Sequence, residues 1–244
     1  MTWTYAGLLL LFLPSILAAL VVLGLTVWIC HSYLDKVLRI FAEKPIFVIP
    51  RGPIVDEAED IRLKTADGLE LRGAYIKSTA EQRKGVILFG LEYGANRWSC
   101  VPYCDHLRAT GYDIFAYEPR NQGESDRQPD YEPLQWITDR DVRDCQTALD
   151  YLKSRPDADP RGVGLYGISK GGNAGLAVAA KDRFIRCVLT DGAFATYSVM
   201  VPYMRYWFSI YNKNYMTQGL MPARYYGLFA HLGLRQATAA HKVS

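Results

Sequence analysis

Cysteine is scarce in this chain, with five among 244 residues. A number that is both low and odd excludes a disulfide-stabilised scaffold and indicates reduced thiols in a reducing compartment. An excess of charge of one sign is also lacking, because 28 basic and 25 acidic residues leave a net charge of +3. A dedicated nucleic-acid-binding protein carries more positive charge, so nucleic acid is not an expected partner. Half of the residues are hydrophobic, which excludes a disordered or low-complexity chain.

Charged side chains are absent from residues 6–30, which form an apolar run of 25 residues. About 20 helical residues cross the hydrocarbon core of a bilayer. The first five residues hold no Lys or Arg, and the run is longer than the apolar core of a cleaved signal peptide. We therefore expect a retained, single-pass membrane anchor. The basic residues that follow it are Lys36, Arg39, Lys44 and Arg51. The positive-inside rule then places the rest of the chain in the cytoplasm.

Short apolar runs alternate with segments of helical periodicity from residue 59 onward. The first two runs flank Asp67-Gly68, which is a hairpin signal. Helical segments separate the later runs, and this order predicts an α/β domain with a largely parallel sheet and flanking helices. The chain is thus divided into a transmembrane helix at residues 1–30, a juxtamembrane helix and linker at 31–58, an α/β core at 59–193 and an aromatic, basic segment at 194–244.

The sequence Gly-Ile-Ser-Lys-Gly-Gly at residues 167–172 follows a predicted strand and precedes a predicted helix. This is the context of a nucleophile elbow, a strand-to-helix turn so tight that its neighbours must be small. Gly167 and Gly171 meet that requirement, and the turn would present the Ser169 hydroxyl above the sheet. The backbone N–H of Lys170 would face a substrate oxygen at the positive end of the helix, while its side chain is expected to be exposed. The spacing of a phosphate-binding P-loop is absent.

With this motif in that context, residues 60–194 resemble the α/β-hydrolase family. The resemblance implies a mostly parallel sheet with flanking helices and a nucleophilic serine on the elbow. In the family, the loop after the strand at residues 85–90 usually donates the second N–H group of the oxyanion hole. The resemblance assigns this donor to Leu91, with Glu92 or Tyr93 as alternatives.

Two further segments resemble the same family. Residues 118–125 are similar to the loop that follows its fourth strand, and we interpret their role as purely structural. Residues 189–194 are similar to the end of its sixth strand, which would place Asp191 at the edge of the sheet that carries the elbow.

The chain departs from the family at the acid and the base of the catalytic triad. A serine hydroxyl needs a base to take its proton, and the base needs an acid to orient it. The family usually places both after its seventh and eighth strands, but no Asp or Glu follows Asp191. Three interpretations stay open: an incomplete copy of a longer hydrolase, a short form that hydrolyses nothing, or a variant triad with Asp191 as acid and His231 or His241 as base. In the first two, Asp191 caps its loop and the histidines lie at the surface.

Residues 194–244 combine aromatic and basic side chains, which suit a membrane-facing surface. They also follow the segment that resembles the sixth strand of the family, where the resemblance implies a cap over the active site. The resulting hypothesis is a membrane-anchored serine hydrolase that cleaves an ester, thioester or amide of a small acyl or peptide substrate through an acyl-enzyme. The alternative is an inactive, membrane-tethered binding or scaffold protein. No cofactor is expected, because this chemistry needs none. Cys100 and Cys104, near His106, are interpreted as core side chains rather than metal ligands.

Overall fold

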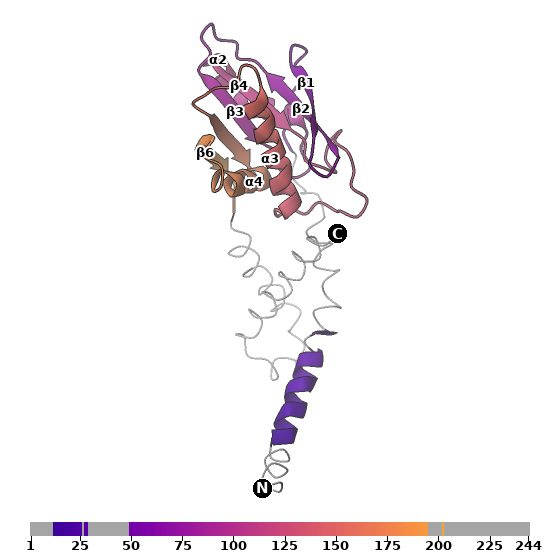
Figure 1. Ribbon diagram of the computed structural model, residues 1–244. Helices are drawn as coiled ribbons and strands as arrows, with labels where there is room; N and C mark the ends of the chain where they lie inside the picture. Colours follow the sequence, from indigo (N-terminus) through magenta and orange to yellow (C-terminus); the bar gives the residue numbers. More distant parts are fainter. Residues whose placement is uncertain (1–11, 26, 29–48, 195–201, 203–244) are drawn as a thin grey trace. The chain divides into compact units, whose positions relative to one another are not determined.

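The computed structural model describes residues 12–25, 27–28, 49–194 and 202. Residues 49–194 contain a six-stranded sheet with helices on both of its faces (Figure 1). The strands are β1 (Glu59–Lys64), β2 (Glu70–Ile76), β3 (Gly85–Gly90), β4 (Tyr112–Tyr117), β5 (Val163–Ile168) and β6 (Ile185–Asp191). The helices are the short 3-10 helix η1 (Arg97–Cys100), α2 (Val101–Ala109), α3 (Asp139–Ser154) and α4 (Ser169–Ala179).

The strand order is β1-β2-β4-β3-β5-β6. β2 pairs antiparallel with β1 and β4, whereas β3 pairs parallel with β4 and β5, and β5 pairs parallel with β6. The predicted hairpin joins β1 and β2, and its Gly68 has φ +90°, a conformation that glycine adopts without a steric cost. The predicted α/β class, with a mostly parallel sheet and flanking helices, is confirmed. Because β3, β5 and β6 run in the same direction, their carboxyl ends meet at one edge, where open α/β sheets bind ligands.

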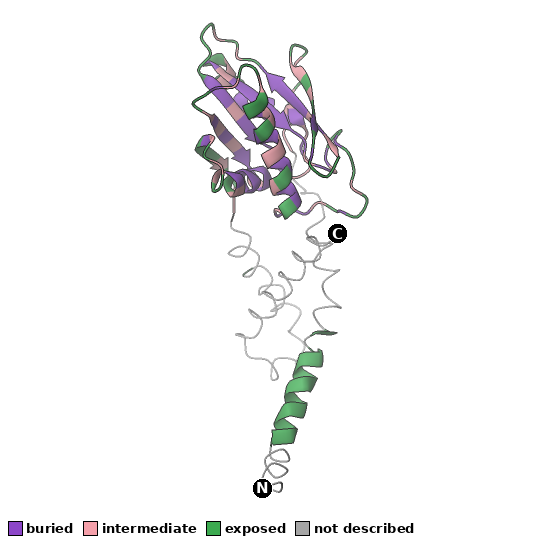
Figure 2. Ribbon diagram, viewed as in Figure 1, coloured by how far each residue is buried: buried purple, intermediate pink, exposed green. Residues whose placement is uncertain are grey.

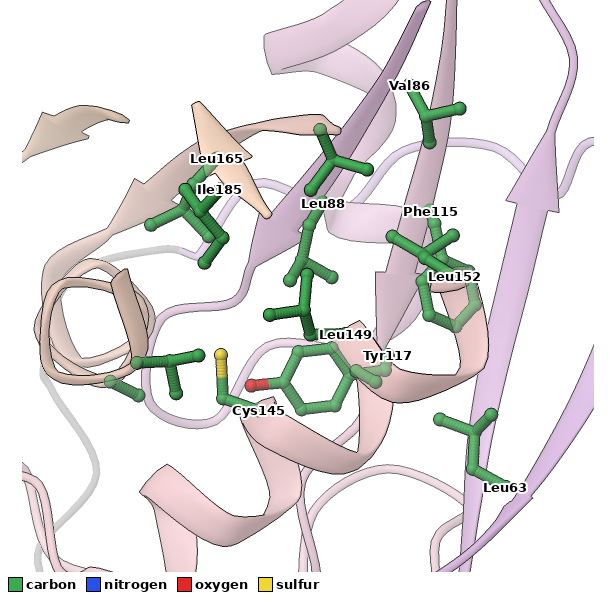
Figure 3. Packing of buried hydrophobic residues seen from close by; sticks show 14 of the residues in the cluster. Leu63, Val86, Leu88, Phe115, Tyr117, Cys145, Leu149, Leu152, Leu165 and Ile185 are labelled. Carbon is green, nitrogen blue, oxygen red and sulfur yellow. The ribbon is translucent and has the colours of Figure 1, made fainter. Parts of the chain in front are cut away.

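Two separate apolar clusters cover the two faces of the sheet. On one face, α3 presents Cys145, Leu149 and Leu152, which pack against the strands together with residues of α4 (Figure 3). These α3 positions are three to four residues apart in the sequence, which is the spacing of one face of a helix. On the other face, Cys100 and Cys104 are buried among apolar side chains from β2, β3 and β4. The central strands are accordingly the most buried part of residues 49–194, as Figure 2 shows.

Helix α4 approaches β5 closely because its inner face is made of very small residues. A Cβ on Gly175 would lie 2.2 Å from Cδ2 of Leu165, a buried side chain of β5. Gly175→Ala should therefore lower the free energy of unfolding, because overpacking costs about 1–3 kcal/mol and outweighs the gain of up to about 1 kcal/mol in helix propensity. Urea unfolding would measure this change. In a Leu165→Ala background the same substitution should be stabilising, and a stabilising effect in the wild-type background would contradict the packing argument.

Residues 12–25 form a helix with exposed side chains (Figure 2). No helix within the described residues combines the length and the apolar character that crossing a membrane requires. The predicted anchor at residues 1–30 and the juxtamembrane segment at 31–58 extend into positions outside the described residues. The predicted cap or membrane-facing segment at 194–244 also lies outside them, apart from residues 194 and 202. These assignments stay predictions.

Candidate active site

Ser169 lies at the junction of β5 and α4, at the carboxyl edge of the parallel strands. Its φ is +48°, in the left-handed region that residues other than glycine rarely adopt. Among the described residues, Asn121 is the other non-glycine residue with a positive φ. Backbone strain of this kind persists only where the surrounding structure imposes it, and it clusters at functional sites. The strand–turn–helix context predicted for Ser169 is present, and its side chain is half-buried.

The predicted elbow glycines, Gly167 and Gly171, allow backbone segments to meet without intervening side chains. A Cβ on Gly167 would lie 2.4 Å from Cα of Gly172, and a Cβ on Gly171 would lie 2.2 Å from the carbonyl carbon of Gly90. Gly90 is the last residue of β3 and pairs with Gly167 in the sheet. The sequence motif identified the glycines of the elbow, but the contact with Gly90 depends on β3 and β5 being neighbours.

Leu91, the predicted second oxyanion donor, directly follows β3 and is buried. Its carbonyl oxygen lies against the elbow, 2.4 Å from the position that a Cβ on Gly171 would take. Leu91 and Lys170, the first residue after Ser169, therefore belong to two chain segments that touch. The resemblance implies an oxyanion hole built from two such segments, and the assignment of its donors to Leu91 and Lys170 stays a prediction.

The alternative donors, Glu92 and Tyr93, lie on the same loop. The Gln122 side chain holds this loop, because its Nε2 donates to the carbonyl oxygens of Glu92 at 3.0 Å and of Ala95 at 2.9 Å. Burial raises the pKa of the Glu92 carboxyl, and the negative charge of Asp191 adds to the rise. A buried carboxyl group therefore lies on the loop that follows β3.

The side chain of Lys170 is buried, so the expectation that it would be exposed is wrong. Its Nζ lies 2.8 Å from Oδ1 of Asp141 on α3, and both side chains are almost fully buried. The same ammonium group lies 5.6 Å from the centroid of the Tyr93 ring. The side chain follows the elbow inward because a carboxylate is available there, and no local sequence pattern reports that partner.

Residues 118–125 are held by their own hydrogen bonds, in agreement with the structural role predicted for them. The Glu118 carboxylate accepts hydrogen bonds from Arg97 N at 3.0 Å, Arg97 Nη1 at 3.2 Å and Glu124 N at 2.7 Å. Ser125 Oγ donates to the carbonyl oxygen of Glu118 at 2.6 Å. These contacts fix the loop next to η1.

Asp191 is the last residue of β6, and its Cα pairs with that of Ile168, the residue before Ser169. The structure therefore brings Asp191 to the same edge of the sheet as the elbow. His231 and His241, the predicted bases, lie outside the described residues.

The cysteines near His106 belong to the hydrophobic core rather than to a metal centre. Cys100 and Cys104 have no exposed surface, and burial raises the pKa of the Cys100 thiol to about 12. His106 points to the exposed side of α2. Within the described ranges, no group of three or more metal-ligating side chains is gathered in one place.

A groove of about 410 Å³ lies away from the elbow, over β3, β5 and β6. Residues that precede these strands, among them Lys84 and Gly162, help to line it. Its lining extends along the strands as far as Tyr166 and Leu189, whereas Ser169 follows the end of β5. Val188 and Leu189 of β6 also line the groove and are exposed. The groove does not contain the elbow.

Comparison with known proteins agrees with this fold. The sequence model of the Prolyl oligopeptidase family matches residues 109–228. The esterase Pf2001 of Pyrococcus furiosus has a similar structure, with a TM-score of 0.51, 16% identity and coverage of 81% of this chain and 71% of the esterase chain. At this level of identity the likeness concerns the fold alone.

Curated sequences are similar over part of their length. Thiohydrolase aneE of Aspergillus aculeatus is 26% identical over 132 residues, which cover 54% of this chain and 40% of the relative. The uncharacterized protein YfhR of Escherichia coli K12 is 28% identical over 158 residues, which cover 63% of this chain and 53% of the relative. The chain thus spans about half the length of the curated relatives it matches.

Proposed function

Because this chain belongs to the α/β-hydrolase superfamily, we propose that it is a serine hydrolase that cleaves an ester, thioester or amide through an acyl-enzyme on Ser169. One observation carries the proposal: Ser169 has φ +48° between β5 and α4. Nucleophile elbows hold their serine in this strained turn so that Oγ is presented beyond the end of the strand.

The proposed reaction begins with attack of Ser169 Oγ on the substrate carbonyl carbon while a base takes the hydroxyl proton. The carbonyl oxygen becomes negative and accepts hydrogen bonds from the N–H groups of Lys170 and Leu91. The bond from the carbonyl carbon to the oxygen, sulfur or nitrogen of the leaving group then breaks, and the base gives its proton to that group. Water attacks the acyl-enzyme in the same way, which releases the acid and restores the serine. Each oxyanion donor contributes about 10²–10³ in rate.

For the acid and the base we propose Asp191 with His231 or His241. Asp191 supports this assignment because β6 ends beside the residue that precedes Ser169. An acid at the end of this strand would orient a histidine that lies over the serine hydroxyl.

For the substrate, we propose a small acyl compound, with a thioester as the first candidate and a short peptide as the second. The name of one relative, thiohydrolase, supports the thioester. The apolar run at residues 6–30 supports our further proposal that the enzyme is anchored in a membrane and faces the cytoplasm. Such an enzyme would meet lipid-like acyl substrates at the bilayer surface.

Covalent labelling tests the nucleophile directly. The full chain should react with a fluorophosphonate probe, and Ser169→Ala should lose the label because the attacking oxygen is gone. Ser154→Ala is a matched control, since Ser154 is an exposed residue at the end of α3 and its loss should leave labelling unchanged. Circular dichroism would establish that each variant is folded.

The second candidate that we propose is a binding or scaffold protein with this fold and no catalysis. A folded wild-type chain that takes up no probe would support this candidate and contradict the hydrolase. Labelling that persists in Ser169→Ala would also contradict the assignment of the nucleophile.

A further inference from the structure

The residue that follows the candidate nucleophile, Lys170, belongs to a buried ion pair. Lys170 Nζ is 2.8 Å from Asp141 Oδ1, with 6% of the lysine side chain and 4% of the aspartate side chain exposed. Removing two charges from water carries a desolvation penalty, and well-packed apolar side chains of similar volume are often at least as stable. The stability of the fold therefore does not explain why a lysine occupies this position. A requirement for a defined backbone geometry at the preceding residue, Ser169, would explain it.

The carboxylate that receives Lys170 is itself held in place. Asp141 Oδ2 accepts hydrogen bonds from Thr138 N at 2.8 Å, Thr138 Oγ1 at 2.8 Å and Tyr131 OH at 3.2 Å. Asp141 thus uses one oxygen to fix the start of α3 and the other to receive the ammonium group. Lys170 is consequently tied to a rigid point of the fold that lies outside both the elbow and the loop after β3.

The same ammonium group also contacts the loop that begins with Leu91. It lies 5.6 Å from the centroid of the Tyr93 ring, within the range of a cation–π interaction. One side chain thereby connects the helix α3, the elbow and the loop after β3. The two proposed oxyanion donors, Lys170 N and Leu91 N, sit on the last two of these segments.

We infer that the Lys170 side chain is a positioning residue that fixes the two oxyanion donors relative to each other, by pairing with Asp141 and packing on Tyr93. This inference rests on the proposed function. A hole made from two separate segments stabilises charge only if its donors keep their spacing, and a displacement of about 1 Å costs about 10²-fold in rate. The side chain acts through the backbone, so it affects the reaction without touching the substrate.

The kinetics of a double variant without charges at positions 170 and 141 distinguish a positioning role of Lys170 from a contribution to stability alone. Lys170→Met should lower both the melting temperature and the rate, because it leaves Asp141 buried and unpaired. The double variant Lys170→Met/Asp141→Asn has no unpaired charge and should recover much of the melting temperature. Its kcat for p-nitrophenyl butyrate should stay about 10–100-fold below wild type, with KM within about twofold, since the donors act on the transition state. Recovery of kcat together with melting temperature would overturn the inference.

Hydrogen exchange gives a second test that does not require activity. The Ala95 N–H donates to Glu92 O within the loop after β3, so exchange in residues 91–95 reports on that loop. In the double variant these amides should exchange at least tenfold faster, while those of β4 stay unchanged. Unchanged exchange in residues 91–95 would overturn the inference, whatever the activity. If wild type fails to react with fluorophosphonate while the loop still loosens in the double variant, the proposed function fails, and only the part of the inference in which Lys170 holds the loop after β3 stands.

Lys153→Met is the matched control for both measurements. Lys153 is a partly exposed lysine of α3 that pairs with Asp150 and Asp182, away from the elbow. Its replacement should change neither kcat nor the exchange of residues 91–95. An effect as large as that of the double variant would show that any lost ion pair disturbs the site, and would overturn a specific role for Lys170.

Discussion

Gly171→Ala should destabilise the fold and slow the fluorophosphonate reaction of Ser169 by at least about 10²-fold. A Cβ at this position would lie 2.2 Å from the carbonyl carbon of Gly90 and 2.4 Å from the carbonyl oxygen of Leu91. Both are backbone atoms, so no change of rotamer relieves the clash, and the loop after β3 must move away from the elbow. Displacement of one oxyanion donor costs about 10²–10³ in rate, and overpacking costs about 3 kcal/mol or more.

Gly68→Ala is the matched control for that prediction. Gly68 has φ +90° and no atom within 4 Å of a Cβ built on it, so its alanine variant suffers backbone strain of about 1–3 kcal/mol without a clash. It lies in the β1–β2 turn and should react with the probe at the wild-type rate. Labelling rates and urea unfolding of both variants would separate the two effects. A Gly171→Ala variant that reacts as fast as wild type would show that the contact with Gly90 and Leu91 does not shape the site.

Arg120→Met should cost about 3–5 kcal/mol of unfolding free energy, because it leaves a carboxylate buried without its partner. Arg120 Nη2 lies 2.7 Å from Asp144 Oδ1, and neither side chain is exposed. Arg120 Nη1 also lies 2.6 Å from Asp67 Oδ2, so one guanidinium group joins the β1–β2 turn to α3. The double variant Arg120→Met/Asp144→Leu leaves no unpaired buried charge at positions 120 and 144, and a large part of the lost stability should return. Urea unfolding of the two variants would measure both changes.

The pH dependence of the unfolding free energy should differ in size between wild type and Arg120→Met. In wild type, a hydrogen bond from Arg120 lowers the pKa of the Asp67 carboxyl despite its partial desolvation. Its stabilisation is present at neutral pH and is lost as the pH falls from the unfolded pKa near 4 through the folded value. For Asp144, burial raises the pKa although Arg120 opposes the rise. Arg120→Met removes that opposition, so acidification should stabilise this variant more than it stabilises wild type through Asp144. Equal slopes for both proteins would contradict this account.

The sequence by itself determined the fold class and the place of the elbow. The helix α3 follows from the spacing of Cys145, Leu149 and Leu152, and the first hairpin follows from Gly68. The elbow follows from glycines on both sides of Ser169, between a strand and a helix. These signals are local: each depends on residues within a few positions of one another, where periodicity and turn geometry are fixed by backbone sterics.

Only the tertiary structure decided where the polar side chains go. Lys170 was expected in solvent, yet it is buried against Asp141, and Arg120 reaches Asp144 over a separation of 24 residues. Gly90 and Gly171 meet because β3 and β5 are neighbours in the sheet. A charged residue carries the same sequence signal whether it is solvated or paired inside the protein. Its burial depends on a partner that the order of the strands brings within reach, and strand order is a property of the whole chain.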